Sequence, residues 1–84
     1  MKSIHDPRYC RVINRIRAAR ITSGLRQADV ARTLGVRRSM ISSIETFERR
    51  SDLLEAHRIA KVCGLQLSDL EPLLTDGGQN VQKE

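Results

Sequence analysis

Aromatic side chains are scarce in this 84-residue sequence, which has no Trp, one Phe (Phe47) and one Tyr (Tyr9). A core without large rings has to be built from Leu, Ile, Val and Ala, a composition that suits closely packed helices better than a β-sandwich. A chain of this length predicts one small domain. Such a domain buries only about 60% of its unfolded surface, which favours self-association.

Signals typical of membrane, secreted and metal-binding proteins are also missing. No apolar run approaches the roughly 18 residues of a membrane helix, and no charged and apolar leader marks a signal peptide. Cys10 and Cys63 lie far apart, without CxxC or Cys/His spacing, which argues against a zinc site. We therefore expect two reduced thiols in a cytoplasmic protein that uses no metal and no cofactor.

The sequence does not suggest an enzyme either. The serines of residues 39–43 and His57 lack the nucleophile elbow and oxyanion turn of a hydrolase. His57 has no Cys or carboxylate at ligand spacing, so we expect it to have a packing or interface role. The short chain also leaves little room for a substrate cleft.

Charge is unevenly distributed along the chain. Residues 1–50 hold 12 basic and 4 acidic side chains, a net charge of +8, whereas residues 51–84 hold 3 basic and 6 acidic ones, a net charge of −3. A basic half that faces a polyanion, with an acidic half turned away, is typical of a nucleic-acid-binding protein. Ordinary solvated helix faces are the alternative, and charge alone does not decide between the two.

Apolar residues recur at three- and four-residue spacing and predict an all-α fold of five helices, at about residues 7–22, 27–34, 38–45, 53–63 and 69–74. Asp6 and Pro7 form a helix start. Capping boxes at Asp52–Glu55 and Ser68–Glu71 begin the last two helices. The domain would then span residues 7–74, between a short arm at residues 1–6 and a disordered tail at residues 75–84.

Two predictions concern the buried and exposed faces of the last two helices. In the fourth helix the spacing predicts five buried residues: Leu53, Ala56, Ile59, Ala60 and Cys63. Residues 65–74 contain more leucines than so short a stretch can bury, so the excess predicts a dimer surface. The candidates for that surface are Leu70, Leu73 and Leu74.

Residues 27–45 organise the rest of the chain. Two short amphipathic helices meet there at a tight turn, where Gly35 supplies the positive φ that the turn needs. The second helix buries Ile41, Ile44 and Glu45. Its opposite face carries small hydroxyl side chains that let a backbone approach the floor of a groove: Ser39, Ser42 and Ser43. We infer that this helix enters the major groove of DNA.

Arg20, followed by GLRQADVARTLGV and SMISSIE, resembles the helix-turn-helix domain of lambda-type phage repressors, Cro proteins and XRE-like bacterial regulators. The resemblance covers about residues 13–74. It implies a five-helix lambda repressor-like fold with the helix-turn-helix at helices 2 and 3. It also implies a homodimer that binds double-stranded DNA at two half-sites about one helical turn apart. The function that follows is transcriptional regulation, with repression as the expected sign.

The resemblance also assigns roles by position. Gln27 would touch a phosphate and support a neighbouring base contact. Arg37 is expected to bind a phosphate because of its place near the N-terminus of the third helix, and not because of the resemblance. The base-facing side chains would be Arg38, Ser39, Ser42 and Ser43. Of these, Arg38 can donate two hydrogen bonds to guanine, although a phosphate contact is its alternative role. Arg20 and Glu45 match an interior ion pair that ties the first helix to the third.

The sequence departs from the family pattern at Arg26, at Arg37 and at Thr46-Phe47, where the family favours a hydroxyl residue, a hydroxyl residue or Pro, and Asn-Gly. Without that Gly, the loop is expected to leave the third helix differently. Arg49 and Arg50, in this loop, remain candidates for the DNA backbone on electrostatic grounds.

A protein-interaction module is the competing hypothesis. The leucine-rich and acidic last third of the sequence would suit the antitoxin of a toxin–antitoxin pair, which holds a small protein partner. A restriction–modification controller protein is a special case of the DNA-binding hypothesis.

Overall fold

The computed structural model describes residues 6–75, and helices are the only regular elements within that range. They are α1 (Pro7–Thr22), α2 (Gln27–Leu34), α3 (Arg38–Glu45), α4 (Leu53–Val62), α5 (Leu67–Leu70) and the 3-10 turn η2 (Glu71–Leu74). The all-α, five-helix prediction is therefore confirmed. The expected arm and tail lie outside the described residues, except for Asp6 and Thr75.

Local signals set the ends of α1 as the sequence predicts. The Asp6 carboxylate accepts the Arg8 N–H at 2.8 Å, and Pro7 occupies the first helical position, where no N–H is needed. The hydrogen bonds from Arg8 lower the pKa of Asp6 from 3.8 to about 2. Gly24, at φ +76°, turns the chain after the last helical turn. The result is a 16-residue helix long enough to underlie the rest of the domain.

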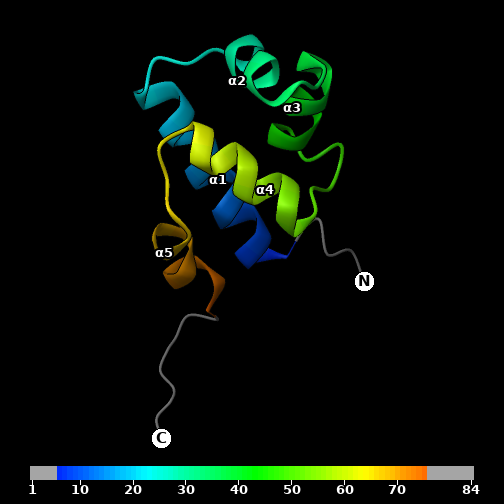
Figure 1. The fold of residues 1–84 in the computed structure, drawn as a ribbon. Helices are drawn as coiled ribbons and strands as arrows, with labels where there is room; N and C mark the ends of the chain where they lie inside the picture. The colour runs from blue at the N-terminus through cyan, green and yellow to red at the C-terminus, as the bar shows by residue number, and fades with distance from the viewer. Residues whose placement is uncertain (1–5, 76–84) are drawn as a thin grey trace, which may run out of the picture.

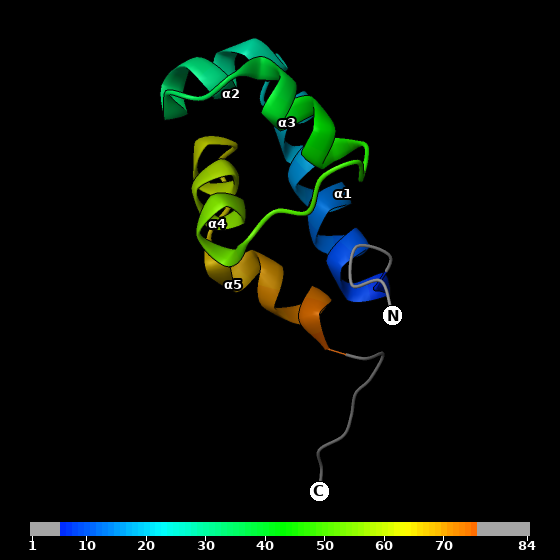
Figure 2. The same cartoon turned by 90° about the vertical axis from the view of Figure 1, so that its right-hand side faces the viewer.

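The core lies where α1, the α2–α3 pair and α4 meet. Figure 1 and Figure 2 show α2 beside α3 at one end of the molecule, with α4 crossing over α1 and α5 at the other end. The core side chains are aliphatic apart from Cys63, whose pKa is raised by burial. They are Val12, Ile13, Ile16, Ala19, Val30, Ala31, Ile41, Ile44, Ile59, Ala60, Cys63, Leu65 and Leu70.

The start of α4 differs from the prediction. Leu53 was expected to be buried but is 76% exposed, because it occupies the first turn of the helix at the rim of a surface groove. The Asp52 carboxylate caps this turn by accepting the Glu55 N–H at 2.8 Å. Leu54 is also exposed, so the first turn of α4 presents two leucines to the surface.

The last helix also begins earlier than predicted, and the Ser68–Glu71 capping box is wrong. Gln66 is the N-cap, and the Asp69 carboxylate accepts its N–H at 2.8 Å. Pro72 has no N–H to continue the α-helical pattern, so the chain tightens into η2 after Leu70. Arg11 of α1 then donates to the carbonyls of Leu73 and Thr75, which holds η2 against α1. None of the helices within residues 6–75 has the length and apolarity needed to span a membrane.

Candidate nucleic-acid interface

The turn between α2 and α3 is tight because Gly35 adopts φ +72°. A Cβ built at this glycine meets no atom within 4 Å, so the backbone conformation, and not crowding, requires glycine there. The Val36 N–H donates to the Ala31 carbonyl at 3.0 Å, and the half-buried Val36 side chain packs on the core. Together these contacts set the angle at which α3 leaves α2.

The outer surface of α3 carries the side chains that the sequence assigns to it. Arg37 is the N-cap residue, Arg38 begins the helix, and both are exposed, as is Ser39. Ser42 and Ser43 are half-buried one turn later. Ile41, Ile44 and Glu45 face inward and are buried, as predicted. The exposed part of this surface is therefore concentrated at the N-terminal end of α3.

A chain of hydrogen bonds connects Arg38 to the interior. The Arg38 guanidinium donates through Nη1 to Gln27 Oε1 at 2.9 Å. Gln27, at the start of α2, donates through Nε2 to Glu45 Oε1 at 3.0 Å. Because the carboxylate takes the amide N–H, the amide oxygen is the group that faces Arg38. Glu45 thus determines which end of the Gln27 amide supports the arginine.

Arg20 and Glu45 form the buried ion pair that the family resemblance implies. Arg20 donates Nε to Glu45 Oε2 at 2.6 Å and Nη2 to Glu45 Oε1 at 2.9 Å, in a bidentate arrangement. The two side chains are only 10% and 5% exposed. Arg20 also donates to the Leu25 carbonyl, so one guanidinium links α1, α3 and the segment before α2.

A second arginine, Arg17, approaches the same carboxylate from α1. Its Nε lies 3.7 Å from Glu45 Oε1, and its side chain is 53% exposed. The sequence pattern alone did not single out Arg17. The available signal was its position three residues before Arg20, which puts the two arginines on neighbouring faces of one helix.

Three basic side chains surround a surface hollow at the start of α2. Arg20, Arg26 and Arg38 line it together with Gln27, and its volume is about 460 Å³. Arg26 pairs with Asp29, and its hydrogen bonds hold the pKa of that carboxyl below its usual value. The N-terminal end of α2 also lines the hollow. Because Arg20 and Arg26 are each paired with a carboxylate, the net positive charge of the hollow comes from Arg38 and this helix end.

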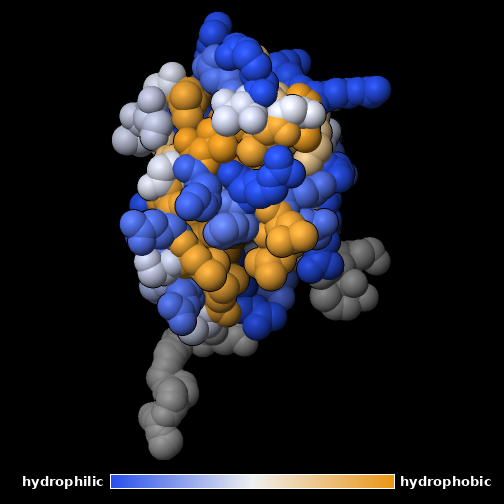
Figure 3. All heavy atoms as spheres, in the orientation of Figure 1, coloured by the Kyte–Doolittle hydropathy of each residue, from blue (hydrophilic) through white to orange (hydrophobic). Residues whose placement is uncertain are grey.

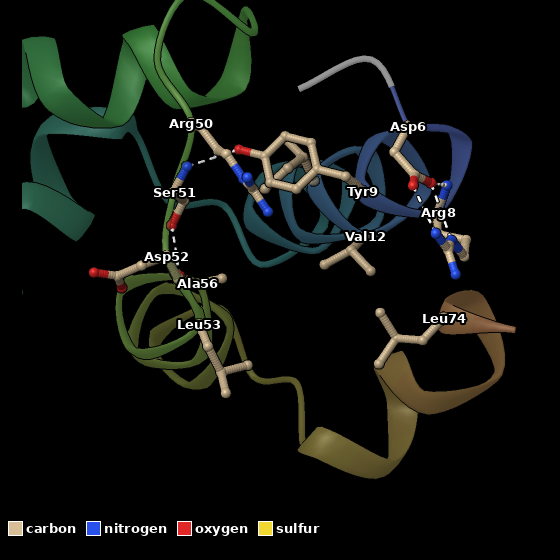
Figure 4. A pocket seen from close by; sticks show the side chains of 11 residues that line it. Asp6, Arg8, Tyr9, Val12, Arg50, Ser51, Asp52, Leu53, Ala56 and Leu74 are labelled. Atoms are coloured by element: carbon tan, nitrogen blue, oxygen red, sulfur yellow. Dashed lines mark hydrogen bonds and ion pairs between the residues drawn. The ribbon is translucent and has the colours of Figure 1, made fainter. Parts of the chain in front are cut away.

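The loop after α3 is fixed to the start of α1 by aromatic contacts. Phe47 adopts φ +64°, the conformation for which the family uses Gly, and its ring meets the Tyr9 ring edge-on at 6.3 Å. The Ser51 N–H donates to Tyr9 Oη at 2.8 Å, and the Arg50 guanidinium lies 5.8 Å from the Tyr9 ring centroid (Figure 4). Arg49 pairs with Glu55 at 3.0 Å. The loop keeps a left-handed turn without glycine.

Of the predicted DNA-binding residues, the structure brings Gln27 and Arg38 into direct contact and places Arg37, Ser39, Ser42 and Ser43 on the adjoining surface of α3. Arg49 and Arg50 are exposed in the loop after α3, where Arg49 pairs with Glu55 and the Arg50 guanidinium lies near the Tyr9 ring. No group of three or more potential metal ligands occurs within residues 6–75.

The comparison with protein families gives one decisive match. The family model described as Helix-turn-helix matches residues 16–70, more than half of the chain. The chain belongs to the lambda repressor-like helix-turn-helix family. This is a family of DNA-binding domains, generally non-enzymatic, whose function is transcriptional regulation through double-stranded DNA. Searches among curated proteins and among solved structures gave no match.

The three leucines expected at a dimer surface differ in burial. Leu70 is 4% exposed and packs in the core, which leaves no surface for a partner, and Leu73 is half-buried. Leu74 is exposed and lines the surface groove that Leu53 also borders. Apolar surface thus lies on the first turn of α4 and on η2, and Figure 3 shows apolar side chains over this end of α4.

Proposed function

We propose that this family member is a cytoplasmic transcriptional repressor that binds a two-fold symmetric operator as a homodimer. The observation that carries the proposal is the support of Arg38 by Gln27 at the exposed start of α3. A long flexible side chain that is already oriented loses less entropy when it binds. This arrangement favours base readout over a loose phosphate contact.

The geometry of Arg38 suits guanine. One guanidinium nitrogen, Nη1, is hydrogen-bonded to Gln27, and the other two nitrogens can donate to the O6 and N7 atoms of one guanine. Such a bidentate contact is worth about 1–3 kcal/mol of discrimination against the wrong base. Ser39, Ser42 and Ser43 specify bases weakly because a hydroxyl accepts several partners.

Arg37, Arg49 and Arg50 are proposed to contact the DNA backbone. Arg37 stands at the N-terminal end of α3 with no side-chain capping hydrogen bond. The Arg49–Glu55 pair is exposed, and such pairs contribute only about 0–1 kcal/mol, so a phosphate can replace Glu55 as the partner of Arg49. These contacts add affinity for all sequences and a dependence on salt concentration.

A selection from random duplexes tests the readout. The expected product is a two-fold symmetric motif with one guanine per half-site that depends on Arg38. Arg38→Ala should relax the preference at that base pair alone, whereas Arg58→Ala, an exposed arginine on α4, is the matched control and should leave the motif intact. Binding with no sequence preference would refute the proposal. Expression of a reporter downstream of the selected site should fall when the protein is present.

The homodimer is proposed to use the apolar surface at the first turn of α4 and η2. A groove of about 300 Å³ there is lined by Val12, Leu53, Ala56 and Leu74 (Figure 4). Leu54, the next residue of α4, is also exposed. Its rim carries charges of both signs, Asp6 and Arg8 on one side and Arg50 and Asp52 on the other. A two-fold interface brings one patch against itself, which a mixed rim permits.

Sedimentation of the purified protein tests this interface. The wild type and Ile21→Ser, which alters an exposed apolar side chain at the far end of α1, should sediment as dimers. The double variant Leu53→Ser with Leu54→Ser should shift toward monomer and lose affinity for the paired half-sites. An unchanged dimer would exclude this surface as the interface.

An antitoxin is the second candidate, and the same exposed leucines favour it because they suit a small protein partner equally well. Expression of the chain together with the gene adjacent to its own distinguishes the two. A stable heterocomplex that the Leu53 and Leu54 substitutions abolish would support the antitoxin. A homodimer that retains no partner would support the repressor.

A further inference from the structure

Three groups converge on one oxygen of Glu45. Arg20 Nη2 donates to Oε1 at 2.9 Å, Gln27 Nε2 donates to it at 3.0 Å, and Arg17 Nε approaches it at 3.7 Å. The first two distances are those of hydrogen bonds, and the third is too long for one. Oε1 of Glu45 therefore already accepts two hydrogen bonds, from Arg20 and Gln27, and Arg17 lies beside it as an additional charge.

The two arginines differ in what else can reach them. The Arg20 side chain is 10% exposed and has three hydrogen bonds to protein atoms. The Arg17 side chain is 53% exposed, and its distance from the carboxylate is too long for a hydrogen bond. One negative charge against two positive ones leaves a net charge of +1 at this point of the surface. That charge resides on the arginine that an external anion can reach.

The location of this charge connects it with the DNA-reading surface. Glu45 ends α3, and Gln27, bonded to the same oxygen, also holds Arg38. We propose that Arg17 binds a backbone phosphate of the DNA strand that passes α3 on the side of α1. This inference rests on the proposed function, since it supposes a bound duplex, and it adds a contact from α1 that neither the sequence nor the family match assigns.

The test compares Arg17 with Arg15, an arginine on the same helix. Both are exposed, and they lie on opposite sides of the buried stripe of α1 formed by Ile16 and Ala19. Arg15 lies on the side from which Arg11 reaches η2, away from Glu45. The pair therefore separates a local contact from the general effect of removing one positive charge.

The measurement is the affinity for the selected duplex and for an unrelated duplex at several salt concentrations. Each phosphate contact contributes about −0.9 to the slope of log affinity against log salt, which corresponds to about 8-fold in affinity at 0.1 M. In the homodimer, Arg17→Ala removes two such contacts, one per half-site. The slope should therefore fall by about 1.8 and the affinity by about 60-fold, for both duplexes. Arg15→Ala should keep the wild-type slope. Arg17→Lys should retain most of the slope, because a phosphate accepts a point charge.

Duplexes with single neutral methylphosphonate linkages identify the phosphate. One position per half-site should weaken binding of the wild type and of Arg15→Ala, yet have no further effect on Arg17→Ala. Thermal unfolding of all variants shows whether the fold is retained. If Arg17→Ala kept the wild-type salt dependence, or if Arg15→Ala lost as much affinity as Arg17→Ala, the phosphate contact of Arg17 would be refuted. The proposed function would be unaffected. A wild type that binds no duplex would overturn the proposed function and this inference with it.

Discussion

The buried Arg20–Glu45 pair gives a prediction that separates stability from base recognition. Glu45→Ala leaves the Arg20 guanidinium, 10% exposed, without its carboxylate and next to a second arginine, Arg17. Removing one partner of a buried pair destabilises a protein by about 3–5 kcal/mol. Because small domains have a total stability of about 5–15 kcal/mol, this change removes a large part of it.

Urea denaturation followed by far-UV circular dichroism measures that loss. A loss of 1 kcal/mol lowers the midpoint of thermal unfolding of a small domain by about 4–8 °C, so the Tm of Glu45→Ala should lie at least about 12 °C below that of the wild type. Glu55→Ala is the matched control, since it removes a carboxylate from a pair with Arg49 that is exposed, and its cost should stay below about 1 kcal/mol. If the two variants were equally stable, the burial of the Arg20–Glu45 pair would not account for its contribution to stability.

Replacing both partners gives the second half of the prediction. In the double variant Arg20→Met with Glu45→Met, apolar side chains fill the space, and stability should return to within about 1–2 kcal/mol of the wild type or exceed it. Gln27, however, has lost the acceptor that orients its amide toward Arg38. The folded variant should therefore discriminate less well at the guanine position, as measured by competition between duplexes. Unchanged discrimination would refute the role assigned to Glu45.

Three further predictions concern the loop after α3 and the start of α1. Phe47→Gly should be more stable than Phe47→Ala by about 1 kcal/mol in urea denaturation, the reverse of the usual order, because φ is +64°; the usual order would exclude backbone strain there. Tyr9→Phe leaves the Ser51 N–H without its acceptor and should cost about 1–3 kcal/mol by the same assay, whereas no loss would show that water replaces the hydroxyl. Hydrogen bonds from Arg8 lower the pKa of Asp6 from 3.8 to about 2, so its contribution is present above pH 3.8 and lost as the pH falls toward 2. Asp6→Asn should flatten that part of an acid titration of stability, and an unchanged titration would contradict the cause assigned.

The first three helices could be predicted because their ends carry local signals. Asp6 and Pro7 start α1, and Gly24 and Gly35 supply the positive φ values that end α1 and α2. The Arg20–Glu45 pair came from the family resemblance and not from spacing, since 25 residues separate the two. Within α3, the division into an inner and an outer face followed from helical periodicity alone.

The last third of the domain was harder to predict because its sequence contains more than one plausible helix start. Gln66–Asp69 and Ser68–Glu71 are both plausible helix starts, and only the structure shows that Asp69 accepts the Gln66 N–H. A leucine-dense segment likewise does not reveal which leucines are buried, because that depends on where the short helix begins. The shift in its start accounts for a buried Leu70 beside an exposed Leu74.

The arrangement around Glu45 links base recognition to the stability of the domain. The side chain proposed to read a base, Arg38, is held by Gln27, and Gln27 is held by a carboxylate whose main partner is buried in the core. A base-contacting side chain on a surface loop could be substituted without affecting the core. Here, a substitution on α1 that moves Arg20 also changes the acceptor of Gln27. We therefore expect variants with altered base preference to arise on α1 as well as on α3. An unbiased selection for altered specificity that returned substitutions only on α3 would contradict this coupling.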